Sequence, residues 1–227
     1  MRYVILCGGA KIDCARINAQ LLPSDFILCA DEGAIHARTM GIFPQMIIGD
    51  MDSIDPETLA WAKDGGVPMS LYPVDKDMTD SELCLFQVPE KDSILLVMPL
   101  SGRFDHVLSN VMIAARYARE GRNIEVTDGR TRIYPLLGPG NLKIDVLSLK
   151  KILASREWII SLIPVGGTVE HVNATGLYYP VEDLTIFSGQ SRGVSNRPVY
   201  GATEVAISFA TGVLLVIISP EDPSNDS

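Results

Sequence analysis

Two carboxylates, Asp50 and Asp52, stand two positions apart in the segment GDMDS at residues 49–53. They lie between an apolar run and a helix-like pattern, so they could simply end a strand and begin a helix, as Asp often does. The alternative is a cation site, because residues two apart in an extended segment face the same way and could reach one ion. An EF-hand loop is excluded, because Asp55 stands where that motif needs Gly and Trp61 where it needs Glu.

Other polar residues with related chemistry follow other strand-like runs of the chain. In open α/β sheets, ligands bind at the carboxyl ends of the strands, so we expect all of these residues to share one rim. They are Gly8 and Gly9 after the first run, Asp31, Glu32 and Gly33 after the second, Asp75, Lys76, Asp77, Thr79, Asp80 and Glu82 after the fourth, and Gly102, Arg103, Asp105 and His106 after the fifth.

Each fragment also has an explanation that needs no ligand. Thr79 and Glu82 fit a capping box at a helix start, where Asp80 would favour the helix dipole. Asp105 fits the N-cap of the next helix. The Gly8-Gly9 pair matches neither a dinucleotide fingerprint nor a phosphate-binding P-loop. No single fragment therefore identifies a function.

The combination of fragments is more informative than any one of them. Carboxylates crowded on one rim repel each other unless a cation lies among them. Oxygen ligands without His or Cys suit Mg²⁺, which typically binds one or two carboxylates, waters and phosphates. Lys76 and Arg103 would contact phosphate oxygens, Arg with its forked geometry. The rim therefore predicts a Mg–nucleotide site for phosphoryl or pyrophosphoryl transfer, where positioning and charge neutralisation do most of the catalysis.

The first half of the chain alternates between strand-like and helix-like patterns. This alternation predicts an α/β fold, a mostly parallel sheet with helices on both faces. The expected strands are 3–8, 25–31, 45–50, 67–73, 92–100 and 122–128, and the expected helices are 11–22, 32–41, 55–66, 79–88 and 104–120.

Strand-like runs dominate after residue 130, and they predict a smaller all-β sandwich domain. The expected strands are 132–137, 157–165, 168–176, 184–189, 203–210 and 212–219, with one helical stretch at 147–155. We therefore expect an α/β nucleotide-binding catalytic domain over 1–135, a β-sandwich domain over 140–220 and a disordered tail over 221–227.

Composition argues against a disordered chain, a nucleic-acid binder and a membrane-spanning protein. The chain has 227 residues, is 47% hydrophobic and carries a net charge of −9, so it can bury a core but is a poor nucleic-acid binder. No run reaches the length of a membrane span. The cysteines lack metal-ligand spacing, so we expect them to be reduced and buried in a cytoplasmic protein. They are Cys7, Cys14, Cys29 and Cys84.

Several motifs together resemble those of the bacterial-type thiamine pyrophosphokinases, in the same order and with the same spacing. In the first half these are CADEGA (29–34), GDMDS (49–53), DKDMTDSE (75–82) and SGRFDHVLSN (101–110). In the second half they are GLYYPVEDLTI (176–186), GVSN (193–196) and GVLLVI (212–217). The resemblance spans nearly the whole chain, and its motifs are specific in combination although each alone is weak.

The resemblance implies Mg²⁺-dependent transfer of pyrophosphate from ATP to the hydroxyethyl group of thiamine, giving thiamine diphosphate and AMP, by a homodimer with a nucleotide domain and a β-sandwich. It implies metal ligands at Asp50, Asp52 and Asp77, and a catalytic set of Asp52, Asp77, Asp80 and Arg103, in which one carboxylate accepts the hydroxyl proton. Together with the rim, the resemblance gives a nucleotide-binding set of Gly9, Asp31, Gly33, Lys76, Thr79, Arg103, Asp105 and His106. It also implies that thiamine contacts Ser195 and Asn196.

The chain departs from the family pattern at three positions. Glu32 and Ser101 stand where the family commonly has Gly, and Met51 replaces a Phe. Met for Phe is a tolerable apolar exchange. Glu32 adds a negative side chain beside a phosphate-binding turn, so it must point away or the local geometry must differ.

Three other interpretations stay open at this point: a different Mg-dependent enzyme, such as a phosphohydrolase or a kinase that makes ADP; a non-catalytic nucleotide or thiamine sensor; and a purely structural role. The thiazolium cation of thiamine could stack on aromatic rings of the second domain, although core packing is the favoured role for most of them. These rings belong to Trp158, Tyr178, Tyr179 and Phe187.

Overall fold

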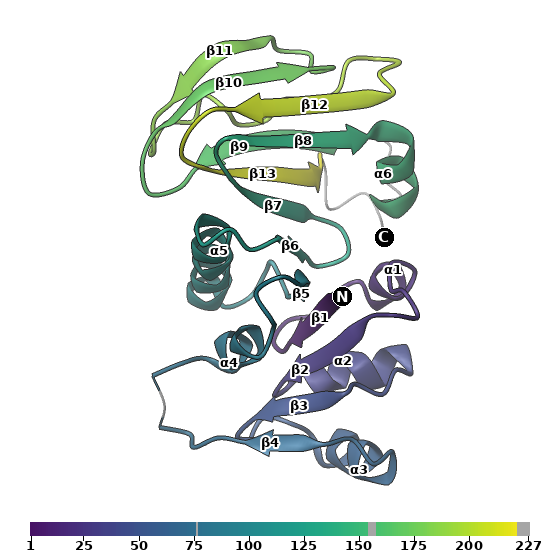
Figure 1. Ribbon diagram of the computed structural model, residues 1–227. Coiled ribbons are helices and arrows are strands. Elements are labelled where there is room, and N and C mark those ends of the chain that lie inside the picture. The colour runs from purple at the N-terminus through teal and green to yellow at the C-terminus, as the bar shows by residue number, and fades with distance from the viewer. Residues whose placement is uncertain (76, 154–157, 222–227) are drawn as a thin grey trace. The chain divides into compact units, whose positions relative to one another are not determined.

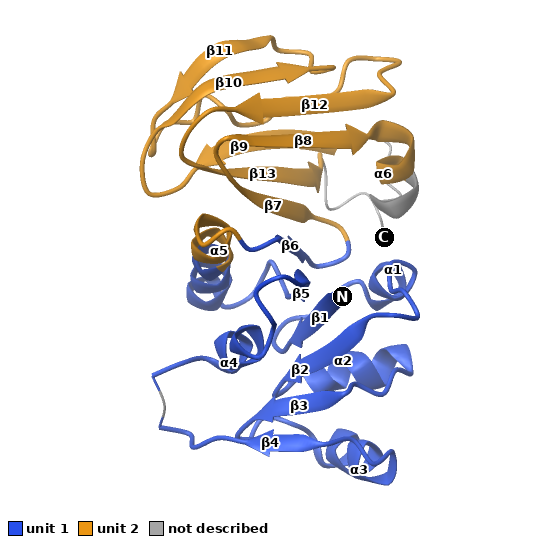
Figure 2. Cartoon of the chain, in the orientation of Figure 1, with its two compact units in different colours: residues 1–113, 122–129 blue, residues 114–121, 130–227 orange. Residues whose placement is uncertain are grey.

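A computed structural model describes residues 1–75, 77–153 and 158–221 of the chain. It divides into two compact units, one of residues 1–113 with 122–129 and one of residues 114–121 with 130 onward (Figure 2). Lys76 and the predicted tail after residue 221 lie outside the described residues. Each unit is described below by itself.

The sheet of the first unit is wholly parallel. Its strands are β1 (Arg2–Cys7), β2 (Phe26–Ala30), β3 (Met46–Gly49), β4 (Met69–Leu71), β5 (Ser93–Val97) and β6 (Ile124–Thr127), and they lie in the order β4-β3-β2-β1-β5-β6. Strands β2, β3 and β4 follow one another along one edge of β1, and β5 pairs with the opposite edge of β1. The topological switch point therefore lies between β1 and β5, where open α/β sheets bind ligands.

Helices cover both faces of this sheet, as predicted. They are α1 (Cys14–Asn18), α2 (Gly33–Met40), α3 (Pro56–Asp64), α4 (Asp80–Phe86) and α5 (Phe104–Arg119). Figure 1 shows α1, α2 and α3 on one side and α4 with the start of α5 on the other. The helix predicted over 11–22 is shorter than expected, because Asp13 caps it by accepting a hydrogen bond from the Arg16 N–H and it ends at Ala19.

The start of α2 packs directly on β1 through Gly33. A Cβ on this residue would lie 1.9 Å from the carbonyl oxygen of Leu6 and 2.6 Å from its carbonyl carbon. Only glycine allows the two backbones to come this close. The contact holds the segment between β2 and α2, which carries Asp31 and Glu32, against the carboxyl end of β1.

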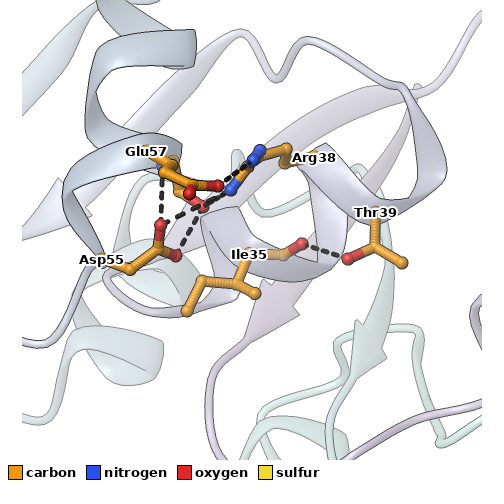
Figure 3. Close-up of polar contacts among 6 residues, drawn as sticks. Ile35, Arg38, Thr39, Asp55 and Glu57 are labelled. Atoms are coloured by element: carbon orange, nitrogen blue, oxygen red, sulfur yellow. Dashed lines mark hydrogen bonds and ion pairs between the residues drawn. The ribbon is translucent and has the colours of Figure 1, made fainter.

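The start of α3 is tied to α2 by charged side chains (Figure 3). Asp55 is the N-cap of α3 and accepts hydrogen bonds from the Thr58 N–H at 2.9 Å and the Thr58 hydroxyl at 2.6 Å. These bonds hold the pKa of Asp55 below its ordinary value. Arg38 of α2 lies 3.4 Å from Asp55 and 2.6 Å from Glu57. This N-cap anchors the end of the segment that carries Asp50 and Asp52.

The second unit is a sandwich of two antiparallel sheets, as predicted. One sheet has the order β7-β13-β9, from Arg132–Leu137, Val213–Pro220 and Trp158–Pro164. The other has the order β11-β10-β12-β8, from Val181–Ile186, Val169–Thr175, Glu204–Phe209 and Gly140–Asp145. Buried residues of both sheets, such as Leu214 and Ile207, form one core with Val146 and Leu149 of α6 (Val146–Leu153).

Strand β8 was not predicted from the sequence, although its residues lie at the start of the expected second domain. Its side chains alternate between half-buried and exposed, and only Ile144 is buried. It nevertheless pairs with β12 over its whole length. Pairing with a neighbouring strand, which a single sequence does not reveal, therefore determines this strand.

The cysteines are free thiols, and three of them are buried as predicted, whereas Cys14 is half-buried. Burial raises the pKa of the Cys7 thiol to about 12, so this side chain stays protonated. Among the described residues, no helix is both long and apolar enough to span a membrane.

Candidate active site

A cavity of about 400 Å³ opens at the switch point of the first unit. Its walls come from the segments that follow β1, β2 and β5 and from the starts of α4 and α5. The lining residues are Cys7, Gly8, Gly9, Ala10, Ala30, Asp31, Glu32, Ser53, Thr79, Asp80, Ser81, Met98, Pro99, Ser101, Arg103, His106, Val107 and Asn110. Part of the predicted rim therefore lines one space that is large enough for a small ligand, whereas other predicted residues, such as Asp75, Glu82 and Gly102, do not line it.

Three carboxylates converge beside this cavity. Asp31, Asp50 and Asp52 each offer one oxygen atom within 4.8 Å of the other two. Asp31 joins the pair because β2 and β3 are adjacent and parallel, and its N–H donates to the carbonyl of Ile48 at 2.8 Å. The Asp31 carboxylate in turn accepts a hydrogen bond from the Met51 N–H at 2.9 Å.

The surroundings of Asp31 oppose its ionisation. Burial raises the pKa of Asp31, the negative charges of Asp80 and Asp50 raise it further, and backbone N–H groups of Glu32 and Met51 oppose the shift. A cation among these carboxylates would relieve the repulsion. A donor set made only of carboxylate oxygens fits Mg²⁺ or another hard divalent cation.

The predicted metal ligand Asp77 does not belong to this group. It is exposed, as Asp52 is, but it is not one of the three described carboxylates that lie close to one another. Its neighbour Lys76 is outside the described part of the chain. The assignment of both residues to the site stays a prediction.

The start of α4 brings polar groups to the cavity wall. Thr79 is the N-cap, and its hydroxyl accepts a hydrogen bond from the Glu82 N–H at 3.3 Å, as the capping pattern predicted. Thr79 and Asp80 both line the cavity. The buried hydroxyl of Ser81 donates to the side-chain amide oxygen of Asn110 on α5 at 2.8 Å and so links the two helices.

Ser81 and Asn110 were not predicted as site residues. For Asn110 a signal was present, because it stands three positions after Val107 and four after His106, which places it on the same helical face as these two residues. All three line the cavity.

Arg103 is paired with Asp105 at the mouth of the cavity. Its guanidinium donates to both carboxylate oxygens, at 2.6 Å and 3.3 Å, and both side chains are largely exposed. The hydrogen bonds from Arg103 hold the pKa of Asp105 below its ordinary value. The N-cap role suggested for Asp105 is wrong, because α5 begins at Phe104 and Asp105 lies inside its first turn. Arg103 lines the cavity, whereas Asp105 does not.

The two glycines of the predicted nucleotide set have different places. Gly9 lines the cavity, and its N–H donates to a carboxylate oxygen of Glu32 at 2.8 Å. Gly33 does not line the cavity. Its observed role is the close packing of α2 on β1.

The residues assigned to thiamine lie in the second unit. Asn196 is buried, and its side chain accepts from the Tyr179 and Arg197 N–H groups at 3.0 Å and 2.9 Å and donates to the Tyr179 carbonyl at 2.9 Å. Ser195 is exposed and has a positive φ of 61°. A cavity of about 160 Å³ borders Asn196 and Tyr179.

The expectation that most of the four aromatic residues named above pack in the core is wrong, because only Trp158, which is 3% exposed, does so. Tyr178, Tyr179 and Phe187 are each more than half exposed. The ring face of Tyr178 is already covered by the Arg197 guanidinium, 4.6 Å from the ring centroid. Tyr179 and Phe187 are therefore the better candidates for stacking on a ligand.

Comparison with known proteins gives two family matches. Residues 19–126 match the catalytic domain of thiamin pyrophosphokinase, and residues 149–214 match the vitamin B1 binding domain of the same enzyme. The thiamine pyrophosphokinase of Bacillus subtilis strain 168 is 28% identical over 219 residues, which cover 96% of this chain and 98% of that protein.

Solved structures agree with these matches. A crystal structure of thiamine pyrophosphokinase from Bacillus subtilis superposes with a TM-score of 0.83 at 23% identity, covering 98% of this chain and all of the other. The thiamin pyrophosphokinase of Geobacillus thermodenitrificans superposes with a TM-score of 0.79 at 26% identity, covering 99% of each chain. Since both domain models and full-length relatives agree with the motifs and with the cavity that they line, this chain belongs to the thiamine pyrophosphokinase family of enzymes.

Proposed function

We propose that the protein transfers the β,γ-pyrophosphoryl group of ATP to the hydroxyethyl oxygen of thiamine in the presence of Mg²⁺, forming thiamine diphosphate and AMP. The observation that carries the proposal is the group of Asp31, Asp50 and Asp52 beside the switch-point cavity. The names of the relatives supply thiamine and pyrophosphoryl transfer, and the carboxylate group supports a metal-bound nucleotide as donor.

The three grouped carboxylates are the residues that would hold Mg²⁺, and Asp77 is a further proposed ligand from the sequence. When bound, Mg²⁺ would neutralise phosphate oxygens and make the β-phosphorus of ATP more electrophilic. The acids contribute by their fixed positions, which orient the donor for attack in line with the leaving AMP.

Cationic and polar side chains of the chain would complete the nucleotide site. Arg103 offers the forked donors that suit a phosphate, and it would exchange Asp105 for that ligand. His106 and Thr79 line the same cavity and offer further polar groups. Lys76 keeps its proposed role beside the phosphates.

A carboxylate must accept the proton of the thiamine alcohol, because a primary alcohol is a weak nucleophile. Asp52 lies in the carboxylate group, and Asp80 lines the cavity, whereas Asp77 has neither place in the described structure. We therefore favour Asp52 or Asp80 for this role.

Thiamine is proposed to contact Ser195 and Asn196. Since the side-chain amide of Asn196 already bonds to the backbone of Tyr179 and Arg197, its contribution is to shape the segment that presents the exposed Ser195. We also propose that the enzyme is a homodimer, which sedimentation analysis of the purified protein would test.

The decisive experiment is an AMP-release assay with ATP, Mg²⁺ and thiamine. We expect AMP and thiamine diphosphate in equal amounts, no AMP without thiamine, and almost no turnover by Asp50→Asn. Asp64→Asn is the matched control, because Asp64 is an exposed carboxylate at the end of α3, away from the cavity lining. Formation of ADP or free phosphate would instead support another kinase or a phosphohydrolase, and binding without turnover would support a sensor.

A further inference from the structure

The side chain of Glu32 turns toward the cavity, although the sequence led us to expect that it points away or that the local geometry differs. Glu32 is the N-cap residue of α2, but its side chain makes no capping hydrogen bond to that helix. Instead, its carboxylate accepts the hydrogen bond from the Gly9 N–H at 2.8 Å, 23 positions back along the chain. The acid therefore bridges the turns that follow β1 and β2.

The turn after β1 is built to make room for this side chain. A Cβ on Gly8 would lie 2.5 Å from the Cβ of Glu32 and 2.8 Å from its carboxylate oxygen. Gly9 has a φ of +111°, a conformation that residues with a side chain rarely adopt. The glycine pair thus accommodates Glu32, and the backbone N–H of Gly9 is already bonded to an anion.

A phosphate is a poor ligand for this end of the cavity. It would have to displace the carboxylate from Gly9 and then lie beside the negative charge. Within the described residues, no Lys or Arg forms an ion pair with Glu32 to offset that charge. The phosphates would instead lie near Arg103 and the carboxylates that would hold a cation, and the nucleoside would then lie against Gly9 and Glu32, which line the same cavity.

We propose that Glu32 binds the ribose hydroxyls of the nucleotide and makes the site prefer ribonucleotides to deoxyribonucleotides. An ionised carboxylate has capacity for several hydrogen bonds and accepts readily from hydroxyl groups. This inference rests on the proposed use of ATP.

The test compares kcat/KM for ATP, 2′-deoxyATP and 3′-deoxyATP in the wild type, Glu32→Gln and Glu32→Ala. We expect the wild type to prefer ATP to at least one deoxy analogue by about tenfold to a hundredfold, the range for a hydrogen bond to a charged group. Glu32→Ala should bring this ratio close to one. Glu32→Gln should give an intermediate ratio, because its amide oxygen still accepts from Gly9. The ratio is insensitive to a general loss of active enzyme, so a partly disturbed turn would not mask the effect.

Glu90→Gln is the control, because Glu90 is an exposed acid outside the cavity lining. It should keep the wild-type ratio. Calorimetric titration with AMP and its two deoxy forms repeats the comparison without turnover, so failure of the ATP reaction itself would be distinguished from failure of the Glu32 assignment. The proposal would be overturned by a wild type that does not discriminate between ATP and its deoxy analogues, or by a Glu32→Ala variant that keeps the wild-type ratio. It would also be overturned if Glu32→Ala changed only the discrimination against inosine triphosphate, in which the adenine amino group is replaced.

Discussion

Replacing Asp50 by Asn should stabilise the protein without metal and destabilise it relative to the wild type with metal. The substitution removes one negative charge from the group that Asp50 forms with Asp31 and Asp52. It keeps a side-chain oxygen of the same shape, which can still accept the 3.3 Å hydrogen bond from the Asp52 N–H. The change is therefore mainly one of charge.

The magnitude follows from the separation of the carboxylates. Two unit charges at 4.8 Å, the limit for this group, repel by about 1 kcal/mol at the dielectric constant of water and by about 3.5 kcal/mol at an effective value of 20. Asp31 is 6% exposed and Asp50 is half-buried, so the pair lies between these limits. In a chain of this length each kcal/mol shifts the melting temperature by about 2–4 °C. We therefore expect a rise of about 2–14 °C in EDTA.

Thermal unfolding by circular dichroism, with EDTA and with several millimolar Mg²⁺, measures both effects. Mg²⁺ should raise the melting temperature of the wild type and should raise that of Asp50→Asn much less, because a cation stabilises only the state that binds it. Asp64→Asn should shift equally in both buffers. If Asp50→Asn melts no higher than the wild type in EDTA and gains as much from Mg²⁺, the carboxylates are turn residues and the metal assignment is wrong.

Three further perturbations test other parts of the structure. Gly33→Ala should cost about 3 kcal/mol or more in urea unfolding, because its Cβ would meet a β1 carbonyl at 1.9 Å, whereas Gly41→Ala, which meets nothing within 4 Å, should cost about 1 kcal/mol for its positive φ. His36 is buried, and burial lowers its pKa, so its contribution to stability is present above its ordinary pKa of 6.5 and is lost as the pH falls below that value. In His36→Phe this loss of stability at acidic pH should be smaller, which urea unfolding measured at several pH values would show. Arg103→Lys should lower kcat/KM for ATP by roughly tenfold or more, since Lys lacks the forked donors; unchanged kinetics would mean that Arg103 serves only to pair with Asp105.

Much of the first unit could be predicted because its strands are buried on both faces. Such strands appear as short apolar runs, as in β1 and β5. The caps at Asp55 and Thr79 follow local rules that depend on a few neighbouring residues. By contrast, β8 depends on a partner far along the chain, and the half-exposed pattern of its side chains gave no local signal.

The candidate site was predictable in its general location but not in its exact membership. The register of β2 against β3 places Asp31 beside Asp50 and Asp52, whereas the sequence assigned it to the nucleotide alone. Local pattern reveals that strands exist but not which strands are adjacent, so it could not pair these acids. The direction of the Glu32 side chain could not be predicted either, because it depends on the space left by Gly8 in another loop.

The segment that carries Asp50 and Asp52 is fixed at both of its ends. Its first end continues β3, whose last residues bond to Asp31 and β2, and its far end is Asp55, which α3 and Arg38 hold in place. Asp31 and Met51 also adopt positive φ values, 45° and 66°, which are strained for residues with a side chain. The acids therefore cannot separate to lower their mutual repulsion. Folding itself sets their geometry, so a cation and its nucleotide would meet ligands already in place, and little reorganisation energy would be added to the barrier of each turnover.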